Sequence, residues 1–161
     1  MTEWRALTDD EVTDLATRLR SLEWSWQVAD GPGLADGFGW RVVLSEPDWV
    51  MLDTGFGMGS GEIRGRDDKA VAIEVRVTEF ADDSDRARTR DAFAAMTDAL
   101  TGALGEPTAR IPGEFPQIRW AGTESTLVLQ DMAVSVLLTL VSNAELADDD
   151  HKAELEEPGL L

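Results

Sequence analysis

The residue types in this chain that could do chemistry are mostly carboxylates, and several flank one glycine-rich segment. Asp53 and Glu62 lie on either side of the alternating glycines of residues 55–61, and the pair Asp67 and Asp68 follows. Paired carboxylates can bind a divalent cation or share acid–base work. Their spacing does not match an EF-hand loop, and a strongly acidic chain places carboxylates close together by chance. A small metal-dependent enzyme or sensor is therefore an alternative hypothesis, and our leading expectation includes no metal and no other cofactor.

The glycines do not have the context of a phosphate-binding loop. A dinucleotide-binding loop needs a helix N-terminus directly after the glycines, and a P-loop needs a lysine there. Here residues 62–65 read Glu-Ile-Arg-Gly and lead to another predicted strand. We interpret residues 55–61 as a flexible hairpin connection. Its apolar residues Phe56 and Met58 are candidate contacts for a partner.

The chain lacks most groups that enzymes use for nucleophilic and general-base catalysis at neutral pH. It has no cysteine and no tyrosine, and its one histidine, His151, lies in an acidic C-terminal segment. Ser25, Ser60 and Ser125 therefore have no histidine partner near them in the sequence, which argues against a Ser-His-Asp triad. The sequence favours a protein that is not an enzyme.

Charge indicates the kind of partner. Thirty-two acidic residues against fourteen basic ones give a formal net charge of −18. Such a surface repels phosphate backbones and anionic membranes and attracts basic proteins. The N-terminus has no basic, apolar leader pattern, and the longest apolar stretch, residues 132–141, is too short to span a bilayer. We expect a basic protein partner, no binding to nucleic acid or membranes, and a cytoplasmic location.

The elements that must position these residues begin with a helix near 8–21. Thr8 is a suitable N-cap, and Glu11 completes a capping box. The hydrophobic period then changes from about 3.6 to 2, which predicts strands. These strands cover residues 24–28, 38–44, 49–53 and 70–80, with a loop at 30–37 that turns at Gly31-Pro32-Gly33.

A second helix near 84–104 ends at Gly105, and a connection rich in proline and glycine follows it. Strands are then expected at 117–121, 126–130 and 133–141. The order α-β-β-β-β-α-β-β-β predicts an α+β fold with a mainly antiparallel sheet and both helices on one face. We expect one domain over residues 1–147 and an acidic tail over 148–161 that either forms a short helix or stays disordered.

Trp49 does not fit the buried face of its own predicted strand. This tryptophan is out of phase with Val50 and Leu52, so one strand cannot bury all three on the same face. An exposed tryptophan beside acidic residues is a common arrangement at interfaces. The expected core comprises Leu15, Leu19, Trp26, Val42, Ile73, Val75, Phe93, Met96, Leu100, Val128 and Leu138. The predicted partner-binding residues are Trp49, Asp53, Phe56, Met58 and Glu62.

Two segments carry a resemblance to a known family. They are WRALTDDEVTDLATRLRSLEWSW, from Trp4, and RWAGTESTLVLQDMAVSVLLTLVSNAE, from Arg119. With the order of elements, they make the chain resemble an uncharacterised family of small acidic actinobacterial proteins. Members look like immunity proteins of polymorphic-toxin systems, and the order of elements is similar to the secretion-chaperone-like fold. The resemblance implies a partner-binding role and supplies no catalytic motif.

The leading hypothesis is a non-catalytic, acidic protein-binding module, an immunity protein or a chaperone for a basic partner. The metal-dependent enzyme or sensor that uses carboxylates near the glycine-rich segment is one alternative. A structural homodimer that buries strand edges is another.

Overall fold

The first helix begins where its capping box predicts. The computed structural model describes residues 4–156 and places α1 at Asp9–Arg20. The Thr8 hydroxyl accepts a hydrogen bond from the Glu11 backbone N–H, and the Glu11 carboxylate accepts one from the Thr8 backbone N–H. Both bonds satisfy amides that the first turn of a helix leaves unpaired. The buried stripe of α1 consists of Val12, Leu15, Ala16 and Leu19.

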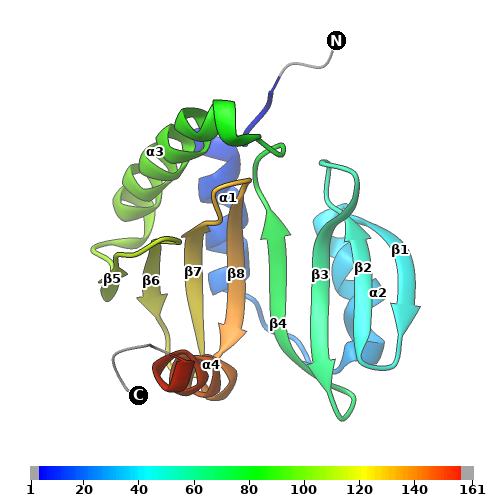
Figure 1. The fold of residues 1–161 in the computed structure, drawn as a ribbon. Helices are drawn as coiled ribbons and strands as arrows, with labels where there is room; N and C mark the ends of the chain where they lie inside the picture. Colours follow the sequence, from blue (N-terminus) through cyan, green and yellow to red (C-terminus); the bar gives the residue numbers. More distant parts are fainter. Residues whose placement is uncertain (1–3, 157–161) are drawn as a thin grey trace.

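Eight strands form one antiparallel sheet in the order β1-β2-β3-β4-β8-β7-β6-β5 (Figure 1). The strands are β1 (Arg41–Glu46), β2 (Trp49–Asp53), β3 (Met58–Arg66), β4 (Lys69–Arg76), β5 (Ala109–Ile111), β6 (Gln117–Ala121), β7 (Ser125–Asp131) and β8 (Val136–Ser142). Each half of the sheet is a run of consecutive hairpins, and the halves join where β4 pairs with β8. The predicted α+β class with an antiparallel sheet is confirmed.

Three helices cover one face of this sheet. α1 and α3 (Arg86–Leu104) contact β7 and β8, and α2 (Gly31–Phe38) contacts β1 and β2. Figure 1 shows α1 and α2 behind the sheet. Every second side chain of the strands points toward these helices, as the two-residue period of a strand requires. The buried core between them includes Leu19, Ile73, Met96, Leu100 and Leu138.

A fourth helix, α4 (Asn143–Glu156), lies on the opposite face against β7 and β8 (Figure 1). Its Leu146 packs against Ala72, Val128 and Val141, which form a second, smaller apolar cluster. The described residues therefore contain four α-helices where the sequence prediction gave two on one face, and the predicted order of elements is wrong in these details. Within residues 4–156 no helix has the length and apolar composition needed to cross a bilayer.

The prediction failed most clearly around α2. The predicted strand at 24–28 does not form: residues 24–26 are irregular, Gln27 makes one isolated bridge to Lys69, and Val28–Asp30 is a short 3-10 helix. Trp26 has a φ of 56°, which is outside the strand region. The predicted loop at 30–37 is helical because Pro32 fits the first turn of a helix, where its missing N–H is not needed. Gly39 then ends α2 with a φ of 76°, so β1 starts at Arg41 and not at residue 38.

The prediction for the glycine-rich segment was also wrong in part. From Met58 onward these residues belong to β3, in which Gly61 pairs with Leu52 on one side and Val75 on the other. A Cβ atom on Gly61 would lie 2.5 Å from the Thr54 side chain, so a larger residue does not fit there. Glycine is thus used for close packing inside a strand. The short strand β5 was missed as well.

Most of the predicted core is buried. Leu15, Leu19, Ile73, Val75, Met96, Leu100, Val128 and Leu138 are buried. Trp26, Val42 and Phe93 are half-buried. Trp26 belongs to the irregular segment before α2, and Val42 lies beside a register shift in the edge strand β1, so neither has the regular alternation on which the prediction depended.

The predicted boundary after residue 147 falls within α4. Asp150 of α4 accepts two hydrogen bonds from the Arg119 guanidinium, at 2.8 Å and 2.7 Å. These bonds hold the pKa of Asp150 below its ordinary value. The division into a domain and a tail stays a prediction, and residues 157–161 of that tail lie outside the described residues.

Truncation after Ala147 tests this division. The truncated protein is expected to stay folded and to lose on the order of 1–2 kcal/mol in the free energy of unfolding, because the main loss is one partly exposed ion pair. Urea unfolding followed by circular dichroism measures the change. Aggregation, or a loss of several kcal/mol, would show that residues 148–161 are an integral part of the domain.

Candidate partner-binding face

The sheet face opposite α1, α2 and α3 is only partly covered, and we call it the open face. Its side chains meet in register across the strands, with Trp49 opposite Arg64 and Glu62 opposite Glu74. The register places Trp49, Met51, Glu62, Arg64, Ala72, Glu74, Arg76, Gln117, Arg119, Val128, Gln130, Leu137, Thr139 and Val141 on this face.

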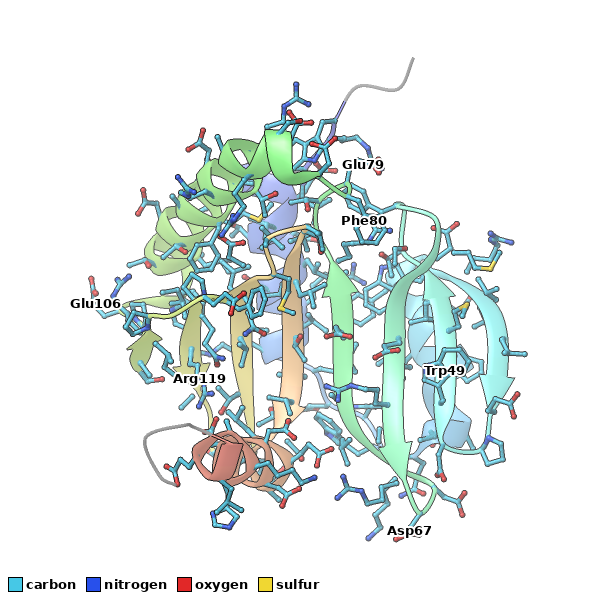
Figure 2. The ribbon with its side chains drawn as sticks, in the orientation of Figure 1. Trp49, Asp67, Glu79, Phe80, Glu106 and Arg119 are labelled. Carbon is cyan, nitrogen blue, oxygen red and sulfur yellow. The ribbon has the colours of Figure 1, made fainter. Side chains whose placement is uncertain are left out.

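α4 covers one end of the open face and is fixed there by ion pairs. Glu145 is buried and accepts hydrogen bonds from Arg66 at 3.0 Å and 3.2 Å. Arg119 bonds to Asp150, as described above, and Leu146 supplies the apolar contact. In Figure 2 α4 crosses the sheet near Arg119, whereas Trp49 and Phe80 lie away from this helix. Within residues 4–156 the rest of the face, over β2, β3 and β4, has no helix above it.

Two glutamates sit side by side near the middle of the open face. Glu62 and Glu74 are directly opposite each other on β3 and β4, so that a proton on one carboxyl group can form a hydrogen bond to the other. The Trp49 indole N–H donates to Glu62 Oε2 at 3.0 Å, and Arg64 Nε lies 3.5 Å from Glu62 Oε1. Glu62 is therefore held in place from three sides. Like charges directly opposite on neighbouring strands are destabilising, so this arrangement needs a proton or a cation between the carboxyl groups.

The protonation of Glu74 follows from this geometry. Burial, followed by the hydrogen bond and the negative charge of Glu62, raises the pKa of Glu74 to about 7, and the positive charge of Arg64 partly offsets this shift. The protonated Glu74 carboxyl donates its hydrogen bond to Glu62. Glu74 therefore changes its protonation state near neutral pH.

An aromatic side chain borders this pair. Phe80 is 66% exposed, and its ring lies over the Arg76 guanidinium, with 3.9 Å from the guanidinium carbon to the ring centroid. Arg76 itself donates to the backbone oxygens of Thr78 and Phe56, at 2.9 Å and 2.8 Å. Burial lowers the pKa of Arg76, and Glu79 partly offsets this effect. These two hydrogen bonds fix the guanidinium beneath the Phe80 ring, and Arg64, not Arg76, is the cation that lowers the pKa of Glu74.

Two hollows of the open face share Glu74 as a common wall. One has a volume of about 250 Å³ and is bordered by Glu62, Arg76, Phe80, Val134 and Leu137. The other has about 280 Å³ and lies toward α4, next to Arg64, Arg119 and Asp149. The carboxyl pair is thus reachable from solvent, and the first hollow combines apolar walls with two carboxyl groups.

The structure brings only some of the predicted site residues together. Trp49 and Glu62 are in contact on the open face, as their hydrogen bond shows. Met58 is 70% exposed at the start of β3. Phe56 is only 9% exposed, with the Arg5 guanidinium over its ring at 4.2 Å, so little of its side chain is available to a partner.

Asp53 has a structural task. Its carboxylate accepts hydrogen bonds from the Gly55 and Gly57 backbone N–H groups, at 2.9 Å and 3.2 Å, and from Arg41 at 3.2 Å. These partners, Gly55 first and then Arg41, lower the pKa of Asp53. The carboxylate therefore fixes the turn between β2 and β3.

The sequence left a metal site around Asp53 and Glu62 as an alternative. In the structure these two described side chains point to different partners: Asp53 accepts a hydrogen bond from Gly55 of its own loop, and Glu62 accepts one from Trp49. The carboxylates that do converge in the described part of the chain are Glu145, Asp148 and Asp149 of α4, whose oxygens lie within 4.8 Å of one another. Glu145 is already bonded to Arg66. Burial and the charge of Glu145 raise the pKa of Asp149.

The sequence prediction did not include Glu74 among the site residues, because the alternation of its strand placed Glu74 on the solvated face. The missing information was the register between β3 and β4, because β3 itself was not predicted.

Comparison with known proteins identifies a family and no function. No curated protein and no solved structure matches the chain. A family model described as "Family of unknown function (DUF6301)" matches residues 10–142, which include all eight strands and almost all of α1 together with α2 and α3. The matched segment ends where α4 begins. Since it covers well over half of the chain, this protein belongs to the DUF6301 family of unknown function.

Proposed function

We propose that this chain is a non-catalytic protein-binding module that takes a basic partner protein onto its open face, in the manner of an immunity protein or a chaperone in the cytoplasm. The observation that carries the proposal is the uncovered part of the sheet, where Trp49 and Phe80 flank the Glu62–Glu74 pair. Aromatic side chains at the centre of a surface and carboxylates beside them are a favourable combination for a protein interface.

Two physical contributions support this choice. The exposed aromatic and aliphatic side chains Phe80 and Val134, which are 66% and 48% exposed, would lose water on binding and slow the dissociation of the complex. The net charge of −18 would attract a basic partner over several ångströms and speed association. The proposal therefore assigns affinity to the open face and the rate of association to the charge of the whole molecule.

A second candidate function comes from one specific observation. Glu62 and Glu74 share a proton near neutral pH, and pairs of carboxyl groups with separated pKa values serve as acid and base in some enzymes. In that case the purified protein would turn over a small molecule, and Glu74→Gln would abolish the activity. Retention of that activity in Glu74→Gln would eliminate this candidate.

The salt dependence of binding tests the role of charge. With the partner identified by cross-linking and mass spectrometry, stopped-flow mixing is expected to show an association rate that falls by about tenfold or more between roughly 0.01 M and 0.15 M ionic strength. Dissociation should change much less, because apolar contacts are insensitive to screening. An association rate indifferent to salt, or an acidic partner, would refute the electrostatic part of the proposal.

The role of the open face needs a substitution with a matched control. Phe80→Ser is expected to weaken binding by about tenfold or more, mainly through faster dissociation. Leu155→Ser removes an apolar side chain of similar exposure (62%) that borders neither hollow of the open face, and it should leave affinity unchanged. If both variants bind like the unmodified protein, the partner does not use the open face.

A further inference from the structure

We infer that the Glu62–Glu74 pair and the hollow beside it form a subsite for one lysine or arginine side chain of the partner. This inference rests on the proposed function, because it names the group that the open face recognises.

The shape of the hollow suits a long side chain with a charged end. Its volume is about 250 Å³, and Phe80, Val134 and Leu137 provide apolar walls for an aliphatic stem. Gly59 also lines the hollow, and no other described part of the protein lies within 4 Å of the position that its Cβ would take, which leaves room at the start of β3. Lysine and arginine bury their stems against apolar surface while the charged end seeks a partner, here Glu62 and Glu74.

The charges around Glu74 favour a cation as the guest. On β3, both Glu62 and Arg64 face Glu74. Arg64 Nε lies 3.5 Å from Glu62 Oε1, so these two side chains already form an ion pair. From β4 comes Arg76, whose N–H groups are bonded to backbone oxygens. The neighbours on β8, Leu137 and Thr139, are uncharged.

Among the described residues beyond β8, the groups that face this side of the pair include Arg119 and Asp149. Arg119 of β6 is paired in a bidentate manner with Asp150, and Asp149 of α4 adds a further negative group on that side. The cation that faces the pair, Arg64, is already an ion-pair partner of Glu62 through its Nε at 3.5 Å. A cationic guest would find two carboxyl groups with one proton between them.

The exchange balances in charge. Without a guest, the pair carries one proton and one negative charge. An incoming ammonium or guanidinium group stabilises both carboxylates, so Glu74 releases its proton to solvent and the pair gains one negative charge against the positive charge of the guest. An opposite charge at this distance lowers the pKa of a carboxyl group by about 1–3 units. Binding at the subsite therefore releases up to one proton near neutral pH and strengthens as the pH rises through the pKa of Glu74.

The experiment uses the intact chain and a side-chain analogue as the probe. Carboxyl ¹³C NMR follows the titration of Glu74 between pH 4 and pH 9, with n-butylguanidinium chloride and with sodium chloride at the same ionic strength. We expect n-butylguanidinium to lower the pKa of Glu74 by about one unit more than sodium chloride does. Neutral n-butanol, which carries the same stem, should have no such effect. Equal titrations in n-butylguanidinium and sodium chloride would overturn the inference.

A variant with a control makes the result specific. Glu62→Gln removes one carboxylate and keeps the shape, so the pKa of Glu74 should fall toward its ordinary value and the effect of the probe should largely disappear. Glu106→Gln changes an exposed glutamate at the far side of the sheet, next to β5 (Figure 2), and should respond to the probe like the unmodified protein. If n-butylguanidinium shifts the pKa of Glu74 as much in Glu62→Gln as in the unmodified protein, the inference is also overturned. Circular dichroism confirms that each variant is folded.

The two proposals fail in distinguishable ways. If Phe80→Ser weakens partner binding while Glu62→Gln binds normally with no change in proton release, the open face is the binding surface and the cation subsite is wrong. If the probe shifts the pKa of Glu74 as expected but Phe80→Ser binds the partner normally, the subsite exists and the proposed docking of the partner is wrong.

Discussion

Replacing Glu74 with glutamine is expected to stabilise the protein at pH 8 and to remove most of the gain in stability that the unmodified protein shows between pH 8 and pH 5. Folding raises the pKa of Glu74 from 4.5 to about 7, so the folded protein binds this proton more tightly than the unfolded chain does. Stability from this group is therefore greatest below pH 4.5 and is lost as the pH rises to about 7. A shift of this size corresponds to roughly 3 kcal/mol, as an order of magnitude.

Glutamine removes this dependence because its amide is neutral at every pH and can still donate to Glu62. Urea unfolding at pH 5, 6, 7 and 8 measures the difference between the two proteins. Glu106→Gln is the control, since it removes the same charge from an exposed site and accounts for the relief of general repulsion in an acidic protein. Parallel pH profiles for Glu74→Gln and the unmodified protein would show that the Glu62–Glu74 pair does not hold a proton at neutral pH.

Other carboxylates set the acidic limit of stability. Hydrogen bonds lower the pKa of Glu11 at the capping box, of Asp53 at its turn and of Asp82 before α3. Such groups stabilise the fold above their unfolded pKa values, and this contribution is lost as the pH falls below about 4. Together with Glu74, they give an expected maximum of stability near pH 5.

The substitution Leu100→Ala is expected to cost about 2–5 kcal/mol in the free energy of unfolding. Leu100 is fully buried on α3, in the core between that helix, α1 and the sheet, so its removal loses apolar burial and leaves a cavity. Urea unfolding at pH 7 measures the change. Leu155→Ala removes the same atoms from a side chain that is 62% exposed, and it should cost only a few tenths of a kcal/mol. Equal small losses in both variants would mean that α3 is not docked against the core.

Local signals were sufficient to predict the parts of the fold whose stabilising contacts are close in sequence. The capping box of Thr8 and Glu11 defines the start of α1, and the alternation in the predicted strand 70–80 identifies β4, although β4 ends at Arg76. The two-residue period of a strand also predicted that Trp49 lies on the face opposite Val50 and Leu52, and β2 has this arrangement. In each case a few neighbouring residues decide both the element and the direction of its side chains.

Elements with ambiguous local chemistry were not predictable in this way. Gly31-Pro32-Gly33 is typical of a turn, but Pro32 is equally compatible with the first turn of a helix, and tertiary contacts of α2 decide between them. The glycines of β3 have weak strand propensity, and one of them, Gly61, is needed where Thr54 approaches closely. Because β3 was taken as a loop, its register with β4 was unknown, and Glu74 could not be paired with Glu62. The candidate site depended on that long-range pairing.

The most direct test of the open face as the binding surface is hydrogen exchange of this chain, measured by mass spectrometry with and without its partner. Binding to the open face should protect amides in β3 and β4 and in residues 132–137, which comprise the turn before β8 and the first two residues of that strand. The amides of α1 and α2 should stay unchanged. The same footprint should weaken in Phe80→Ser and persist in Leu155→Ser. Protection confined to α1, α2 or α3, with β3 and β4 unchanged, would place the partner on the other side of the molecule and contradict the proposal.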